Sequence, residues 1–96
     1  MTPRARKIAA AVSAASVLAA SAEGLRQYAY YDPPGILTVC YGSTTNVEKG
    51  RKYSLEECKA RLGADMLAAV KAVDRCVPDA PLPVLVAFSD AAFNLG

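Results

Sequence analysis

The first 22 residues combine a basic head with an uncharged run. Arg4, Arg6 and Lys7 form the head, and residues 8–22 (IAAAVSAASVLAASA) carry no ionisable side chain. As a helix this run would extend about 22 Å, whereas a stable membrane-spanning helix needs about 20 residues for a hydrocarbon core of about 30 Å. A positive head before an apolar run is typical of an export signal, and the short, alanine-rich composition predicts weak membrane insertion.

This leader (residues 1–22) has three interpretations. It is a signal peptide cleaved after the small residues Ala20, Ser21 and Ala22, an uncleaved signal anchor that can leave the membrane, or a plain buried alanine-rich helix. We favour the releasable anchor, because cleavage after Ala22 would leave Glu23 at a new N-terminus without the helical turn before it. The basic head makes the buried helix the least favoured interpretation.

The pattern of residues 23–53 predicts a short helix followed by two strands. Apolar residues at positions i, i+3 and i+4 predict a short helix over residues 23–31, and the sequence DPPG at 32–35 ends it. Residues 36–41 (ILTVCY) are β-branched and aromatic, so they predict a strand. The polar stretch 43–53 contains turn residues and predicts a second, weaker strand.

Residues 54–95 predict two helices. Ser54 and Glu57 form a capping box that opens a long helix over residues 54–76, with apolar residues at helical spacing behind it. Prolines between residues 78 and 83 interrupt the pattern. A second helix follows over residues 82–95, and its predicted buried stripe consists of Phe88, Ala92 and Leu95.

The amino-acid composition excludes several kinds of catalytic and binding site. The 96 residues suffice for one small domain or part of a larger one, and a net charge of +2 with mixed signs does not predict nucleic-acid binding. The chain has no histidine, which excludes a Ser-His-Asp or Cys-His nucleophile and any His-ligated metal. None of the three cysteines forms a CxxC pair, so we do not expect a zinc site. We also expect no other metal and no cofactor. Hydrolysis would have to use carboxylates.

Two acids and a threonine are candidates for such chemistry. Glu23 precedes Asp32 by nine residues, and Thr38 follows on the predicted strand. Glycoside hydrolysis needs one carboxylic acid to protonate the leaving oxygen and a second carboxylate across the scissile bond. Spacing alone is weak support, because two acids at this separation are more often solvated surface charges.

The surrounding residues are more specific. The segments EGLR at 23–26, YYD at 30–32 and GILTVCYG at 35–42 resemble, in order and spacing, the pattern E-G-x-x-x-x-x-Y-x-D…G-x-x-T-x-x-x-G of phage-type lysozymes of glycoside hydrolase family 24. The segments YS at 53–54, EC at 57–58, DRCV at 74–77 and AFNLG at 92–96 are similar as well. The resemblance covers the chain from Glu23 to its end.

This resemblance implies an α+β, lysozyme-like fold with an N-terminal helix. Residues 23–96 would form part of a lysozyme domain: a small β-hairpin lobe (23–53), a long helix (54–76) and the first helix of a larger helical lobe (82–95). Glu23 would be the general acid, Asp32 its ionised partner and Thr38 the residue that positions water. The expected activity is that of a monomeric muramidase, which cuts the bond between N-acetylmuramic acid and N-acetylglucosamine in peptidoglycan and thereby lyses the host cell.

The leader extends the resemblance to the signal-anchor-release endolysins. Such proteins are exported to the periplasm of a Gram-negative host and tethered to its inner membrane, here through residues 8–22. The expected partners are therefore peptidoglycan glycan strands and the inner membrane, with no nucleic acid.

Three departures from the family qualify these expectations, and one of them, Gln27 and Tyr28 where a longer basic residue is often found, is minor. Ser43 stands where the family commonly has a structural histidine, and the family's helical lobe continues past the position of Gly96. We therefore expect the 96-residue chain alone to have little or no activity. The alternative is a truncated, inactive prophage remnant that at most binds wall glycan. A small membrane-anchored structural protein, with both acids incidental, is a third and less favoured interpretation.

The three cysteines leave their pairing open. Cys58 and Cys76 are 18 positions apart on one predicted helix, about 27 Å by helical rise, so they cannot bond to each other. Cys40 bonds to Cys58, or both are small buried apolar residues. Some releasable endolysins are similar in using a disulfide near the site as a lock. Cys76 pairs outside this region or stays free.

Overall fold

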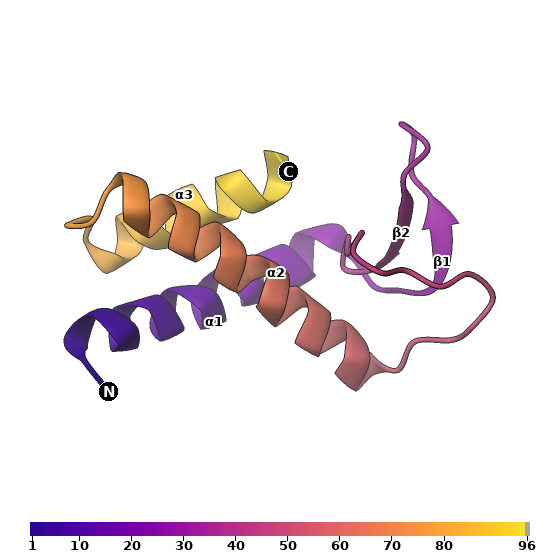
Figure 1. The fold of residues 1–96 in the computed structure, drawn as a ribbon, viewed down its shortest axis with the longest axis horizontal. Coiled ribbons are helices and arrows are strands. Elements are labelled where there is room, and N and C mark those ends of the chain that lie inside the picture. Colours follow the sequence, from indigo (N-terminus) through magenta and orange to yellow (C-terminus); the bar gives the residue numbers. More distant parts are fainter. Residues whose placement is uncertain (96) are drawn as a thin grey trace.

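Three helices and a two-stranded antiparallel sheet form the described part of the chain, residues 1–95 of the computed structural model. Figure 1 shows the helices packed together, with the hairpin at the end of the molecule away from the N-terminus. The molecule measures 43 × 27 × 21 Å. In chain order the elements are α1 (Pro3–Glu23), β1 (Arg26–Tyr31), β2 (Leu37–Cys40), α2 (Leu55–Cys76) and α3 (Leu82–Leu95).

Helix α1 contains the entire uncharged run of the leader and ends at Glu23. Thr2 caps its N-terminus, because the Thr2 hydroxyl oxygen accepts a hydrogen bond from the Ala5 backbone N–H at 3.0 Å. One face is fully buried against α2 and α3 through small residues every fourth position, namely Ala11, Ala15 and Ala19. The least favoured interpretation of the leader, a buried alanine-rich helix, therefore fits one face only, since 17% of the apolar window of α1 is buried. By length and composition α1 could also cross a membrane.

The predicted helix over residues 23–31 is wrong. Gly24 adopts a φ of +73°, which ends α1, and β1 follows almost at once. Tyr30 and Tyr31 of β1 pair with Thr38 and Leu37 of β2. The predicted helix depended on three apolar positions only, whereas three tyrosines in six residues favour a strand once an apolar partner strand is available.

Strand β2 confirms the strand predicted from ILTVCY, but the weaker strand expected within residues 43–53 is wrong for the described residues. That stretch contributes two isolated bridges, Tyr28 with Lys52 and Val39 with Ser43, and a hydrogen bond of 2.8 Å from the Tyr53 N–H to the Gln27 carbonyl. Asn46 and Gly50 have positive φ angles, and these turns leave no extended run long enough to pair.

Helix α2 begins with the predicted capping box. The Ser54 hydroxyl accepts from the Glu57 N–H at 3.0 Å, and the Glu57 carboxylate accepts from the Ser54 N–H at 3.1 Å. Arg51 donates to the same carboxylate at 2.8 Å, and this hydrogen bond, with those from Ser54, lowers the pKa of Glu57 to about 2. The buried row of α2 repeats every fourth residue: Cys58, Leu62, Met66, Val70 and Asp74.

Helix α3 is present, but its predicted buried stripe is wrong. Phe88 is 53% exposed and Leu95 is 90% exposed, while Leu85 and Ser89 are completely buried against the other helices. Because α3 is apolar on most sides, its periodicity does not identify the face that meets α1 and α2. Tertiary packing selects the Leu85 face.

The core has two parts. The helical core gathers the alanine stripe of α1 with buried residues of α2 and α3. A separate small-lobe core consists of Val39, Cys40, Tyr53 and Cys58. Tyr41 is half-buried and packs against both cores, so it marks the junction between the helices and the hairpin.

Candidate active site

Glu23 lies at the junction of the helices and the hairpin. It is the last residue of α1, and its side chain is exposed. A Cβ atom placed on Gly42 would lie 3.9 Å from Glu23 Oε2, so the carboxylate faces the turn that follows β2. Gly42 itself has a φ of +88°, which favours glycine at this turn. The predicted acid therefore borders a tight loop of the small lobe.

Asp32 lies directly after β1, at the hairpin turn. Its Oδ1 accepts a hydrogen bond of 2.7 Å from the Ile36 N–H, and its own backbone N–H donates to the Ile36 carbonyl at 3.0 Å. The Asp32 carbonyl also accepts from the Gly35 N–H at 2.8 Å. These bonds fix the Asp32 side chain in the turn. Among the described residues, Oδ2 has no hydrogen-bond partner.

Thr38 is held by the same turn. It is 4% exposed, faces Tyr30 across the sheet, and donates its hydroxyl proton to the Ile36 carbonyl at 2.9 Å. The peptide groups of Ile36 thus bond to both Asp32 and Thr38. With the proton of its hydroxyl in use, Thr38 Oγ1 is left to act as an acceptor.

The structure brings Asp32 and Thr38 together through Ile36, while the Glu23 carboxylate faces Gly42. Glu23 precedes β1 and Asp32 follows it, so the two acids lie at opposite ends of this strand. A straight strand of this length would extend roughly 20 Å. The register shift between Arg26 and Tyr30 bends this strand. In the described residues no hydrogen bond or ion pair joins Glu23 to Asp32 or Thr38.

Arg61, which no sequence motif singled out, holds the loop after β2 against α2. Its guanidinium donates to the Ser43 hydroxyl at 3.1 Å, to the Thr45 carbonyl at 2.6 Å and to the Asn46 carbonyl at 2.9 Å. The Ser43 that replaces the family's usual histidine is 2% exposed and receives the first of these bonds. Arg61 precedes a buried leucine on α2, and no pattern in the sequence indicates that its side chain reaches this loop.

We expect Arg61→Ala to lower the free energy of unfolding by about 1–3 kcal/mol, because two backbone carbonyls and a buried hydroxyl lose their donor. The urea midpoint measures this change, and Lys71→Ala on the exposed side of α2 is the matched control. Equal midpoints for the two variants would show that Arg61 does not hold the loop.

Asp65 faces the same loop and has a raised pKa. Burial of its carboxyl group is the main cause, and the Ser43 hydroxyl and the Arg61 charge act in the opposite direction. Folding disfavours the ionised form of Asp65. The contribution of Asp65 to the free energy of unfolding is therefore most favourable below its ordinary pKa of 3.8. This contribution is lost as pH rises from there through the folded-state pKa.

We therefore expect Asp65→Asn to raise the melting temperature at pH 7 by a few degrees and to change it little at pH 3, where Asp65 is protonated in both states. Thermal unfolding followed by circular dichroism at both pH values tests this expectation. The exposed Asp79 supplies the control variant Asp79→Asn. A variant that is destabilised at pH 7 would refute this account of Asp65.

A disulfide bond joins Cys40 to Cys58, with an S–S distance of 2.07 Å and a Cα–Cα distance of 4.9 Å. It ties the end of β2 to the first turns of α2, and both residues are buried. Cys40 and Cys58 therefore form a disulfide in this structure and are not two separate apolar residues. Cys76 is free and exposed.

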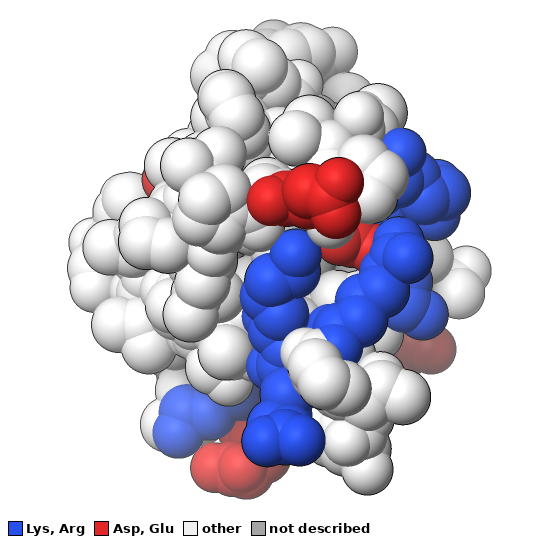
Figure 2. Space-filling view, turned by 90° about the vertical axis from the view of Figure 1, so that its left-hand side faces the viewer, with Lys and Arg blue, Asp and Glu red and all other residues white. Residues whose placement is uncertain are grey.

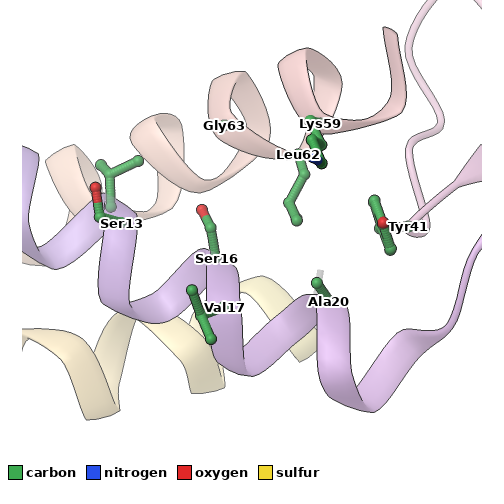
Figure 3. Close-up of a pocket in the computed structure, with 9 residues that line it drawn as sticks. Ser13, Ser16, Val17, Ala20, Tyr41, Lys59, Leu62 and Gly63 are labelled. Carbon is green, nitrogen blue, oxygen red and sulfur yellow. The ribbon is translucent and has the colours of Figure 1, made fainter. Parts of the chain in front are cut away.

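A mostly apolar hollow of about 360 Å³ lies between α1 and α2. Figure 3 shows residues of α1 on one side of it, residues of α2 on the other, and Tyr41 at its end. Tyr41 directly precedes Gly42, so the hollow approaches the turn that faces Glu23. The residues that line it are Val12, Ser13, Ser16, Val17, Ala20, Tyr41, Lys59, Leu62 and Gly63.

Solved structures of known proteins share this arrangement of helices and hairpin. The arrangement is shared with the muramidase domain of SpmX from Asticaccaulis excentricus (TM-score 0.76, 34% identity, 86% of this chain and 57% of that one). It is also shared with the active form of the P1 phage endolysin Lyz (TM-score 0.78, 25% identity, 100% of this chain and 60% of that one). The fold is therefore α+β and lysozyme-like.

The family assignment follows from the sequence comparisons. The sequence model of the phage lysozyme family matches residues 20–96, and the chain belongs to that family. A SAR-endolysin of Bacteriophage PS119 is 34% identical over 76 residues, which cover 77% of this chain and 46% of that protein. A SAR-endolysin of Escherichia phage Mu is 40% identical over 55 residues, which cover 57% of this chain and 32% of that protein. The chain thus spans a third to a half of the length of these relatives.

Proposed function

We propose that this chain carries the catalytic carboxylates of a peptidoglycan muramidase that lyses host cells, with Glu23 as general acid, Asp32 as ionised base and Thr38 as the residue that positions water. The observation that supports these roles best is the shared turn. The peptide groups of Ile36 orient Asp32 and Thr38 together, while Oδ2 of Asp32 stays free to act. Membership of the phage lysozyme family supplies the reaction class.

The proposed reaction is cleavage of the glycosidic bond from N-acetylmuramic acid to N-acetylglucosamine. Glu23 donates a proton to the leaving oxygen, and Asp32 takes a proton from a water that Thr38 Oγ1 holds by accepting a hydrogen bond. An inverting mechanism requires carboxyl groups far enough apart to admit that water.

The exposure of Glu23 lowers the expected rate. A general acid in an open setting shares its carboxyl group with bulk water. We therefore expect the chain to digest peptidoglycan slowly.

The test is the chemical form of the products. Purified peptidoglycan is incubated with the chain, and soluble fragments are analysed by mass spectrometry before and after borohydride reduction. Fragments that end in reducible N-acetylmuramic acid are the expected result. Fragments that end in reducible N-acetylglucosamine or in the non-reducible 1,6-anhydro sugar would contradict the proposed bond and mechanism, and so would the absence of soluble fragments.

We infer in addition that α1 serves as an uncleaved signal anchor, which exports the monomeric chain to the periplasm and tethers it to the inner membrane of a Gram-negative host. Three features support this: α1 is long and apolar enough to span a membrane, it begins with a basic head, and similar proteins are named SAR-endolysins. Cleavage after Ala22 would also remove the alanine stripe from the helical core.

We expect the chain recovered from a Gram-negative periplasm and membrane fraction to retain its leader. Intact-mass measurement distinguishes a chain that begins at Met1 or Thr2 from one that begins at Glu23. A chain that begins at Glu23 would refute the anchor and support a cleaved signal peptide.

A further inference from the structure

Asp74 is an acid in an apolar row. It occupies the last turn of α2, in register with the buried residues Leu62, Met66 and Val70, and it is 3% exposed. A buried carboxylate needs a charged or hydrogen-bonding partner, because an ionised group without one is strongly disfavoured away from water. An aliphatic residue would continue the row without this requirement.

Both hydrogen bonds to Asp74 come from the leader, 70 residues away in the sequence. Arg4 donates to Asp74 Oδ2 from Nε at 2.9 Å and from Nη2 at 2.6 Å. Asp74 Oδ1 has no hydrogen-bond partner in the described residues. The compensation of this buried charge therefore depends on the position of α1.

A second basic residue of the head docks beside the first. Lys7 Nζ donates to the Pro78 carbonyl at 3.3 Å and to the Ala80 carbonyl at 3.1 Å, in the connection between α2 and α3. Figure 2 shows basic side chains gathered around acidic ones on this end of the molecule. Arg6, the third basic residue, is exposed and forms no hydrogen bond or ion pair through its side chain in the part of the chain described.

We propose that Arg4 and Asp74 form a latch that holds α1 in the helical core and opposes its return to the membrane. This inference rests on the proposed role of α1 as a membrane anchor. In the anchored form the basic head stays on the cytoplasmic side, while α2 lies on the other side of the membrane. The two residues are then separated by a hydrocarbon core of about 30 Å.

The latch can close only after all of α1 has left the bilayer. Arg4 is near the end of the helix that crosses last, and a charged side chain in the bilayer is costly. A partly withdrawn helix could bury Ala19 and Ala15 against α2 and α3, but it would leave Asp74 without Arg4. Closure therefore distinguishes complete release from partial release, and reinsertion must first separate the ion pair.

The test measures how the purified full chain partitions between water and phosphatidylcholine vesicles, which carry no net charge. Arg4→Gln and Asp74→Asn are compared with Arg6→Gln and Asp79→Asn, which remove the same charges from neighbouring positions that do not form the pair. We expect the first two variants to raise the ratio of vesicle-bound to free chain about tenfold, equivalent to about 1.4 kcal/mol, and the controls to change it less than about threefold. The double variant Arg4→Gln/Asp74→Asn should exceed neither single variant by much, because the pair is lost only once.

A charge exchange keeps the proposal falsifiable if a single variant misfolds. Arg4→Asp combined with Asp74→Arg should restore partitioning to within about threefold of the parent, and circular dichroism of the free fraction checks that it is helical. Arg4→Gln that behaves like Arg6→Gln, additive effects in the double variant, or no recovery in the exchanged pair would each overturn the latch while leaving the anchor intact. If neither the parent nor any variant binds vesicles, the anchor fails and the latch fails with it. Digestion of peptidoglycan is independent of both results.

Discussion

Glu23→Gln is expected to reduce the release of reducing ends from peptidoglycan at least about 100-fold, because general acid catalysis contributes roughly 10² to 10⁴ to such rates. Glutamine has nearly the same shape as glutamate and cannot supply the carboxylic proton to the leaving oxygen. Glu23 is exposed at the end of α1 and its side chain forms no ion pair in the described residues, so the substitution removes no contact on which the fold depends. The loss should therefore appear without a change in melting temperature.

Export to a Gram-negative periplasm gives a second measurement of the same change. Lysis by the parent chain and not by Glu23→Gln is the expected result, with Glu56→Gln on the exposed side of α2 as the matched control. Asp32→Asn should also prevent lysis, because an amide cannot act as the proposed base. The turn should stay intact, because asparagine Oδ1 can still accept the hydrogen bond from the Ile36 N–H. If Glu23→Gln lyses cells as fast as the parent, Glu23 is not the acid.

The second large effect concerns the Cys40–Cys58 disulfide. We expect Cys40→Ser/Cys58→Ser to lower the free energy of unfolding of the small lobe by about 3 kcal/mol, the value typical of a bond that closes a loop of this size. The effect should be pronounced because the small-lobe core has only four members and the bond joins two of them. Dithiothreitol added to the parent chain should act in the same direction.

Hydrogen exchange locates this loss. Amide protons of Thr38 and Val39 should exchange faster in the double variant, while those of Met66 and Val70 in the helical core should change little, since the two cores are separate. The exposed, free Cys76 provides the control Cys76→Ser. Equal protection of Thr38 in reduced and oxidised chains would show that the hairpin does not depend on the bond.

The disulfide and Glu23 both border the region between β2 and α2. The disulfide and Arg61 both tie this region to α2, and the same region contains Gly42, which faces Glu23. Loosening the small lobe would move Asp32 and Thr38 relative to Glu23, which α1 holds from the other core. We therefore expect reduction of the disulfide to lower muramidase activity without altering any catalytic residue.

Helix α1 is proposed to occupy two environments, a lipid bilayer and the helical core. Small apolar residues are tolerated in a lipid bilayer, and in the folded chain they let α1 approach α2 and α3 closely. A leader of leucine would insert more firmly in a membrane but would overfill the space that Ala11, Ala15 and Ala19 occupy. The alanine-rich composition thus suits a helix that is proposed to serve in both places.

The sequence by itself determined the features that depend on neighbouring residues. The capping box of Ser54 and Glu57 arises from contacts within four residues, so local spacing was sufficient to predict it. Apolar spacing likewise predicted helix α2 and strand β2. The motif around Glu23, Asp32 and Thr38 identified the family, although their roles remain proposals.

Only the tertiary structure decided the rest. Residues 26–31 are a strand because β2 is beside them, and α3 buries Leu85 rather than Phe88 because of where α1 and α2 lie. The ion pair from Arg4 to Asp74 joins positions 70 apart, a distance over which no local pattern carries information. The leader looked like a segment apart from the domain, and it became a core helix because its alanine face fits between two helices that follow much later in the chain.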